Sequence, residues 1–246
     1  MSQRFITPEK LFAARFSDPG QRPQWDAAVI CFRDPKGSRF LVEELGGVPV
    51  GRQVFWGIQE TPALPRVFEA TVGGRRVGIV THCIWGASQA SILVEELAAF
   101  GVRVVLGFGA AGSFDPGLPQ GTQLAACVAP ATDGTSQQYG PGPFRPDPAL
   151  LALAAGAEPV AVATVDAVYR ETPDLVARWR ALGTQVVNME SAPFYAAAET
   201  CGVRALWLGQ VSDMLLDTWH DWHFNRDDMT RATCALCRRI LQEYAE

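Results

Sequence analysis

Two acidic residues stand where apolar, strand-like runs give way to a new element. Glu190 follows the β-branched run 185–187 and precedes a helical pattern over 191–200. Asp213 follows the nearly unbroken apolar run 203–211, which is typical of a strand buried on both faces. Ligands bind at the carboxyl ends of strands in parallel α/β sheets, so both acids are expected in one site. The alternative is that each only caps a helix, because acids favour helix N-termini.

Two glycine-rich segments also follow predicted strands. Residues 85–88 join a strand that ends near His82 to a helix that starts near Ser88, and residues 107–112 follow another strand. Glycine lets backbone N–H groups come close to an anion or a sugar, above all at a helix N-terminus. The second segment opens no clear helix, so it is not a dinucleotide-binding fingerprint. We expect both segments to lie as turns beside the two acids.

The elements that must position these residues alternate between strands and helices. Residues 77–108 read as a βαβ unit, which predicts parallel strands in that part of the sheet. The predicted strands are 27–32, 77–82, 102–108, 124–129, 160–165 and 203–208, and the predicted helices are 88–100, 148–155, 173–182 and 227–244. We therefore expect an α/β fold whose mixed, mostly parallel central sheet is flanked by helices.

Residues 134–148 are rich in glycine and proline, with polar residues between them, and cannot form a central strand or helix. The segment is also too short to link two autonomous domains. It is interpreted either as a loop that lines the site or as a solvated connection without a functional role.

Composition limits the class of ligand. The chain has 246 residues, 48% of them hydrophobic, and a formal net charge of −5 with scattered basic residues, so a small molecule is expected rather than nucleic acid. No apolar run reaches transmembrane length, and charged residues interrupt the N-terminal segment 1–15. These features predict a cytoplasmic protein without a membrane partner.

No metal site is expected. The six cysteines lie mostly within apolar patterns that predict buried, reduced thiols, and the pair Cys234 and Cys237 falls on an amphipathic helix without a second pair. His220 and His223 could form a metal cluster with Asp217, but a surface loop rich in aromatic residues accounts for them better.

The chain resembles the nucleoside phosphorylase family of the hexameric purine and uridine phosphorylase type, which includes the methylthioadenosine/adenosylhomocysteine nucleosidases. Four motifs carry the resemblance, in the family's order and spacing: Gly86-Ala87-Ser88-Gln89-Ala90-Ser91 before Val94-Glu95-Glu96-Leu97, then Gly107-Phe108-Gly109-Ala110-Ala111-Gly112, Asn188-Met189-Glu190-Ser191-Ala192, and Val211-Ser212-Asp213. The resemblance implies a three-layer sandwich formed by one domain over residues 1–246, with residues 1–26 as an N-terminal arm. It also implies a homo-oligomer, either a dimer or a hexamer built as a trimer of dimers.

The resemblance assigns roles to residues at the two acidic motifs. Met189 would pack under the ribose, and Glu190 would accept hydrogen bonds from the 2′ and 3′ hydroxyls. Asp213, beside Ser212, matches the acid that protonates or hydrogen-bonds N7 of the base in purine-specific members. Val168 falls at the position of an aromatic residue that stacks on the base, and its neighbour Tyr169 is the substitute. Glu190 and Asp213 are thus the expected catalytic residues for a purine nucleoside.

The expected phosphate site departs from the family pattern. Phosphorylases have an arginine and a hydroxyl residue where this chain has Gly107 and Ala110, and the other phosphate loop, residues 33–37, loses its first glycine and displaces its arginine. The expected anion-binding residues are Arg33, Gly109, Ala110 and Arg66, although a shifted cation does not reproduce a bidentate clamp.

Three functions fit this pattern. The first is phosphorolysis of a nucleoside with phosphate as co-substrate and no cofactor. The second is hydrolysis by water, although the nucleosidases use an early glutamate where this chain has Arg33. The third is a nucleoside-binding protein with little turnover.

Overall fold

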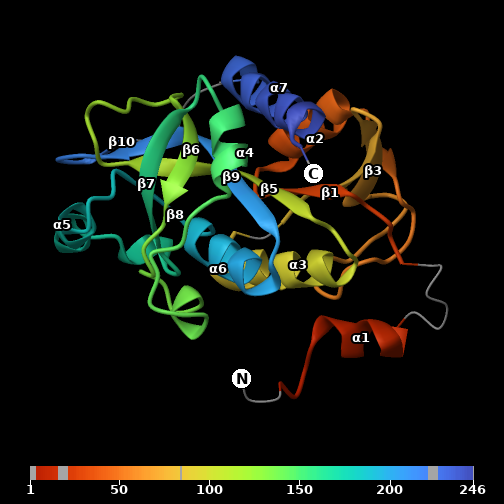
Figure 1. Cartoon of the computed structure of the whole chain (residues 1–246). Helices are drawn as coiled ribbons and strands as arrows, with labels where there is room; N and C mark the ends of the chain where they lie inside the picture. The colour runs from red at the N-terminus through yellow and green to blue at the C-terminus, as the bar shows by residue number, and fades with distance from the viewer. Residues whose placement is uncertain (1–3, 16–21, 84, 221–226, 246) are drawn as a thin grey trace.

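The computed structural model describes residues 4–15, 22–83, 85–220 and 227–245. Its centre is a ten-stranded mixed sheet with the strand order β10-β9-β6-β7-β8-β5-β1-β4-β3-β2 (Figure 1). The strands are β1 (Ala27–Cys31), β2 (Val48–Pro49), β3 (Val67–Val72), β4 (Arg75–Val80), β5 (Val104–Ser113), β6 (Gln123–Val128), β7 (Glu158–Thr164), β8 (Val186–Asn188), β9 (Arg204–Leu215) and β10 (Trp219–His220). The helices are α1 (Pro8–Arg15), α2 (Pro35–Leu45), α3 (Ala87–Ala99), α4 (Pro148–Leu153), α5 (Pro173–Ala181), α6 (Ser191–Cys201) and α7 (Asp227–Glu243), with short 3₁₀ helices η2 (Ser136–Gln138) and η3 (Val168–Arg170).

Strand β5 connects the two parts of the sheet because it pairs with three strands, β1, β8 and β9. It runs parallel to β1 and to β9, and antiparallel to β8. Strand β9 in turn pairs antiparallel with β6, and β6, β7 and β8 follow in parallel, so these five strands close a ring. The expected parallel arrangement of β4, β1 and β5 is confirmed.

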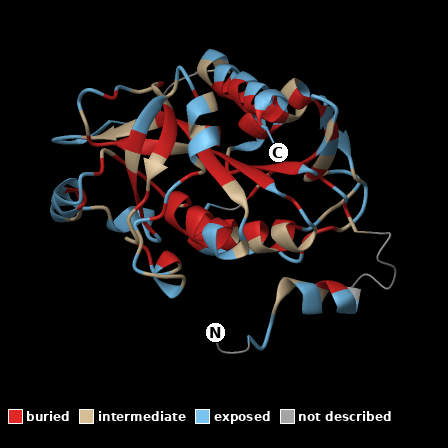
Figure 2. Cartoon of the chain, in the orientation of Figure 1, coloured by how far each residue is buried: buried red, intermediate tan, exposed pale blue. Residues whose placement is uncertain are grey.

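Helices cover both faces of the sheet. Helices α3 and α6 pack together on one face, and α2 and α7 pack together on the other (Figure 1). Buried residues therefore run along the central strands and the inner sides of these helices (Figure 2). All five residues of β1 are buried, which explains why its sequence is a continuous apolar run. The predicted mixed α/β sheet flanked by helices is confirmed.

Two predicted boundaries are wrong in the same way. The glycine segment 107–112 is no turn but part of β5, and Asp213 lies within β9 instead of just past its end. The parallel pairing of the two strands continues to Ser113 and Met214, with one irregularity at Ala111 and Gly112. Glycine and alanine read as a turn, yet here they form strand because a long neighbouring strand supplies their hydrogen-bond partners.

The other peripheral segments differ in part from the sequence reading. The aromatic segment that was predicted to be a loop begins as β10, whose Trp219 and His220 pair with Leu215 and Met214 of β9. His223 lies outside the described residues. Within the N-terminal segment, α1 packs on α3, and the Phe12 ring stacks on Phe100 at 4.2 Å between centroids.

All six cysteines are free. Among the residues that the structure describes, no group of acids, histidines and cysteines could hold a metal ion, and no helix has the length and apolar character needed to span a membrane.

Candidate functional site

A cavity of about 440 Å³ brings the two acidic motifs together. Strands β5, β8 and β9, the segment after β1 and the η3 region form its wall. The residues that line it are Phe32, Arg33, Asp34, Trp85, Ala110, Ala111, Gly112, Val168, Tyr169, Glu171, Val187, Asn188, Met189, Glu190, Gln210, Val211, Ser212 and Asp213. Most of the residues singled out in the sequence therefore share one cavity.

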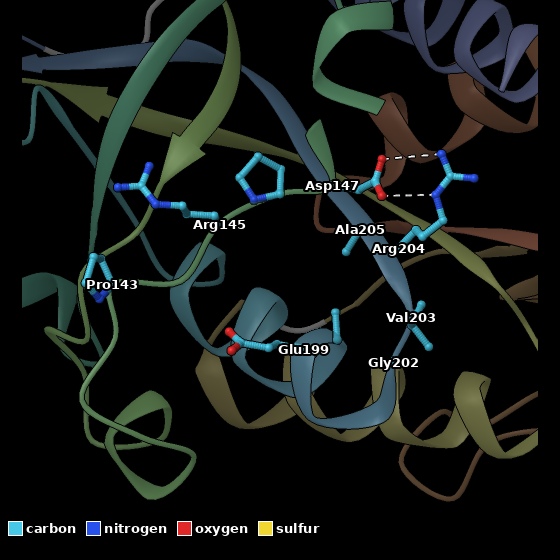
Figure 3. Close-up of a pocket in the computed structure, with 10 residues that line it drawn as sticks. Pro143, Arg145, Asp147, Glu199, Gly202, Val203, Arg204 and Ala205 are labelled. Carbon is cyan, nitrogen blue, oxygen red and sulfur yellow. Dashed lines mark hydrogen bonds and ion pairs between the residues drawn. The ribbon is translucent and has the colours of Figure 1, made fainter. Parts of the chain in front are cut away.

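A second hollow of about 500 Å³ lies beside the end of α6 and the start of β9 (Figure 3). Arg204 donates to both oxygens of Asp147, at 3.0 and 3.3 Å, and Asp147 also accepts the Leu150 N–H at the start of α4. Arg204 and Asp147 therefore pair with each other, and Asp147 also caps α4. The segment 134–148, proposed as a site-lining loop, contributes Pro143, Arg145 and Asp147 to this hollow and no residue to the wall of the first cavity.

Glu190 occupies the N-cap position of α6, but its side chain does not cap the helix. The side chain of Asn188 takes that role, because its Oδ1 accepts the backbone N–H groups of Glu190 and Ser191 at 3.2 and 3.1 Å. The Glu190 carboxylate therefore lies at the wall of the cavity, where its Oε1 accepts the Gly86 N–H at 3.2 Å. Glu190 is only 3% exposed, and burial raises the pKa of its carboxyl to about 7. The helix-capping alternative is therefore wrong for Glu190.

Asp213 is not a helix cap either, because it lies in a strand. Both of its carboxylate oxygens have donors: Ser212 Oγ lies 2.5 Å from Oδ1, and Trp219 Nε1 lies 3.0 Å from Oδ2. The indole donor comes from β10, so the β9–β10 hairpin folds back on the acid that it carries. Two fixed donors give the Asp213 carboxylate one orientation at the cavity wall.

Glu171 also lines the cavity, and the sequence analysis does not single it out. It directly follows η3 and precedes Thr172, whose side chain caps α5. Burial and, to a smaller extent, the nearby charge of Asp213 raise the pKa of the Glu171 carboxyl to about 7. In sequence it resembles an ordinary acid at a helix start, and only the folded chain brings it to Asp213.

The predicted base-binding residues Val168 and Tyr169 both line the cavity, through η3. The Tyr169 side chain is 98% exposed, so it lies at the mouth of the cavity instead of inside it. Met189 and Ser212 also line the wall.

The predicted anion-binding residues separate into two groups. Arg33 and Ala110 line the cavity, whereas, of the described residues, Gly109 and Arg66 lie outside its lining. The Arg33 side chain is 16% exposed, and its Nε lies 4.0 Å from Asp34 Oδ1. Arg66 sits before β3, where its backbone N–H donates to the Glu60 carboxylate at 3.0 and 3.1 Å.

The Trp207 side chain leaves no room for a side chain at Gly107. This indole is fully buried and fills the space beside three glycines of β5 and β9. A Cβ atom would lie 2.8 Å from Trp207 Cδ1 at Gly107, 2.7 Å from Cζ2 at Gly109 and 2.5 Å from Cη2 at Gly209. Such contacts are too close for real Cβ atoms, so the Trp207 side chain occupies this space instead of side chains on the two strands.

A family model described as the phosphorylase superfamily matches residues 28–244. The chain belongs to the phosphorylase superfamily. The resemblance inferred from the four sequence motifs is thereby confirmed. The matched range contains every residue that lines the cavity.

Relatives within the superfamily act on different bases. A uridine phosphorylase of Haemophilus influenzae is 29% identical over 170 residues, which cover 59% of this chain and 66% of the relative. A purine nucleoside phosphorylase of the DeoD type from Clostridium perfringens is 26% identical over 196 residues, which cover 74% of this chain and 80% of the relative. The alignment thus covers slightly less than two thirds of the uridine phosphorylase.

The fold is similar to that of a 5′-methylthioadenosine/S-adenosyl homocysteine nucleosidase from Campylobacter jejuni. The TM-score is 0.69 at 16% identity, and the superposition covers 89% of this chain and 100% of the nucleosidase. The chain therefore shares its fold with a nucleosidase.

Proposed function

We propose that this protein cleaves the N-glycosidic bond of a purine nucleoside by phosphorolysis. The observation that carries the proposal is the Glu190 carboxylate, which is buried at the wall of the cavity and relieved of helix capping by Asn188. A carboxylate placed in this way can accept hydrogen bonds from two adjacent hydroxyls of a ribose, while Met189 packs against the sugar.

The base is proposed to lie against Ser212 and Asp213, with Val168 and Tyr169 near its exposed edge. A purine is favoured because Asp213 can accept an N–H from a ring nitrogen or an exocyclic amine. Burying the sugar between Glu190 and the base side of the cavity would hold the glycosidic bond where a nucleophile can reach C1′.

Phosphate is proposed to bind near Arg33, the cationic side chain of the cavity wall that is mostly buried, and near the backbone at Ala110. A guanidinium is suited to this role because it can donate two parallel hydrogen bonds to an oxyanion. No cofactor is needed for this chemistry.

Hydrolysis is the second candidate, and a specific observation favours it. The indole of Trp207 fills the space beside Gly107 and Gly109, so no second arginine can grip phosphate from that position. A weakly held phosphate would leave water as the competing nucleophile at C1′.

The experiment measures the free base that is released from inosine, adenosine and methylthioadenosine, with and without phosphate. Phosphorolysis predicts release that requires phosphate and yields ribose 1-phosphate. Release at the same rate without phosphate would establish hydrolysis instead. Glu190→Ala is the inactive control, and Glu199→Ala, which changes an acid of the second hollow, is the matched active control.

The protein is also proposed to form a homo-oligomer, a dimer or a trimer of dimers. Exposed apolar side chains that include Val48, Leu64 and Ile92 support a contact between subunits. Light scattering coupled to size-exclusion chromatography tests this, and a mass of one chain at micromolar concentration would contradict it.

A further inference from the structure

Four carboxyl groups line the cavity, those of Asp34, Glu171, Glu190 and Asp213, and they differ in their hydrogen-bond partners. Asp34 accepts the Gly37 N–H at 3.1 Å and caps α2. Asp213 has a donor on each oxygen, and Glu190 accepts the Gly86 N–H. Within the described part of the chain, the Glu171 carboxyl forms no hydrogen bond or ion pair, although Glu171 lines the same cavity and is partly buried. Glu171 is therefore the acid of this cavity that is left to interact with a bound molecule.

Both oxygens of Asp213 already have a hydrogen-bond partner in the fold. The Trp219 indole N–H can only donate, so Oδ2 must accept from it. Ser212 Oγ lies 2.5 Å from Asp213 Oδ1 and 3.2 Å from the Ala111 carbonyl oxygen. The Asp213 carboxyl is therefore fixed in position at the cavity wall.

Glu171 has the opposite environment. Burial raises the pKa of its carboxyl to about 7, and the charge of Asp213 acts in the same direction. The other charged groups that line the cavity are Arg33, Asp34 and Glu190. A carboxyl with a raised pKa and no hydrogen-bond partner among the described residues, in one cavity with a carboxyl whose two oxygens are already hydrogen-bonded, suits a proton donor and an acceptor in one reaction.

We propose that Glu171 is a catalytic residue that gives a proton to a ring nitrogen of the departing base, while Asp213 accepts an N–H of the same base. This assignment rests on the proposed function. The C1′–N bond breaks, its electron pair goes to the base, and the proton of Glu171 neutralises that base. An oxygen of phosphate or water forms the new bond to C1′. The nucleophile releases a proton to solvent. The Glu171 carboxylate then takes up a proton from solvent and is ready for the next reaction.

The experiment compares inosine with 7-methylinosine, whose cationic base departs as a neutral molecule without taking up a proton. Glu171→Gln should lower kcat for inosine by roughly 10²–10⁴-fold, the usual contribution of general acid catalysis, and change kcat for 7-methylinosine less than about threefold. Asp213→Asn should lower the rates for both substrates by similar factors, because it weakens binding of either base. Glu199→Gln, which removes an acid outside this cavity, should leave both rates unchanged.

A pH profile gives a second readout. Turnover of inosine by the wild type should fall as pH rises through about 7, when Glu171 loses its proton, and Glu171→Gln should lack this falling limb. A wild type that cleaves no nucleoside would contradict the proposed function as a whole. If the wild type cleaves inosine, the role of Glu171 is overturned by a variant with unchanged turnover, or by one that slows both substrates equally and keeps the falling limb.

Discussion

The Gly86 amide donates a hydrogen bond to Glu190 Oε1 at 3.2 Å and so joins two residues that are 104 positions apart. Gly86 is the N-cap of α3, and Glu190 is the N-cap of α6. The two helices pack against each other, so the carboxylate lies between two helix N-termini, where partial positive charge favours its ionised form. This arrangement opposes the effect of burial and leaves Glu190 able to change protonation state near neutral pH.

Replacing Glu190 by alanine should abolish glycosidic cleavage and leave the fold intact. Two hydrogen bonds to the sugar hydroxyls would be lost, each worth about 1.5–3 kcal/mol when one partner is charged. The measurement is kcat/KM for inosine, with thermal unfolding and circular dichroism as controls for folding. A Glu190→Ala variant with near-wild-type turnover would remove this residue from the sugar site.

Glu190→Gln should remove a pH dependence of stability. The pKa of the buried carboxyl rises from 4.5 in the unfolded chain to about 7 in the fold, so its contribution is complete below pH 4.5 and is lost as pH rises through 7. One pKa unit corresponds to about 1.4 kcal/mol, so the free energy of unfolding should fall by about 3 kcal/mol more in the wild type than in the variant between pH 4.5 and 8. Urea denaturation at both pH values measures the difference, and parallel curves for the two proteins would contradict it.

Trp219→Phe should weaken base binding, because the Asp213 carboxylate loses a hydrogen bond that fixes its orientation. The substitution keeps an aromatic ring but removes the Nε1–H that donates to Asp213 Oδ2 at 3.0 Å. A partly exposed hydrogen bond of this kind is worth about 1 kcal/mol, which predicts a rise in KM for inosine of about fivefold with a smaller change in kcat. Trp56→Phe, at an exposed tryptophan outside the cavity lining, is the matched control. Equal KM values for the two variants would show that Trp219 does not orient Asp213.

Arg33→Ala should raise the KM for phosphate at least tenfold if the reaction is phosphorolysis. The guanidinium lines the cavity and is mostly buried, and a charge-assisted pair in such a place contributes more than one on the surface. Even the wild type should need phosphate above the usual micromolar-to-millimolar range, because position 107 has no arginine. Arg39→Ala, at an exposed arginine, and Arg66→Ala, outside the cavity lining, should leave this KM unchanged. A large effect at Arg66 alone would relocate the anion site.

Local sequence patterns are sufficient to predict most of the strands and helices. They also predict that Glu190 and Asp213 lie in one cavity. The two apolar runs form β8 and β9, which flank β5 on either side, so sheet topology brings both acids to one cavity. Glu171 could not be found in this way, because its environment depends on burial in the folded chain and on the charge of Asp213, which is 42 positions away in sequence. The glycine segment of β5 resembles a turn in sequence. The side chain that packs beside its glycines comes from Trp207, which is far away in sequence, so local patterns do not reveal it.

The interlock of Trp207 with Gly107 also restricts how this protein can change. An arginine introduced at position 107 alone would meet the indole, whereas a smaller residue at position 207 alone would leave a large buried void beside three glycines. Either substitution alone therefore destabilises the fold before the protein gains a new phosphate ligand. The two positions form an epistatic pair, and a second cationic ligand at this strand can be acquired only through coordinated substitution of both.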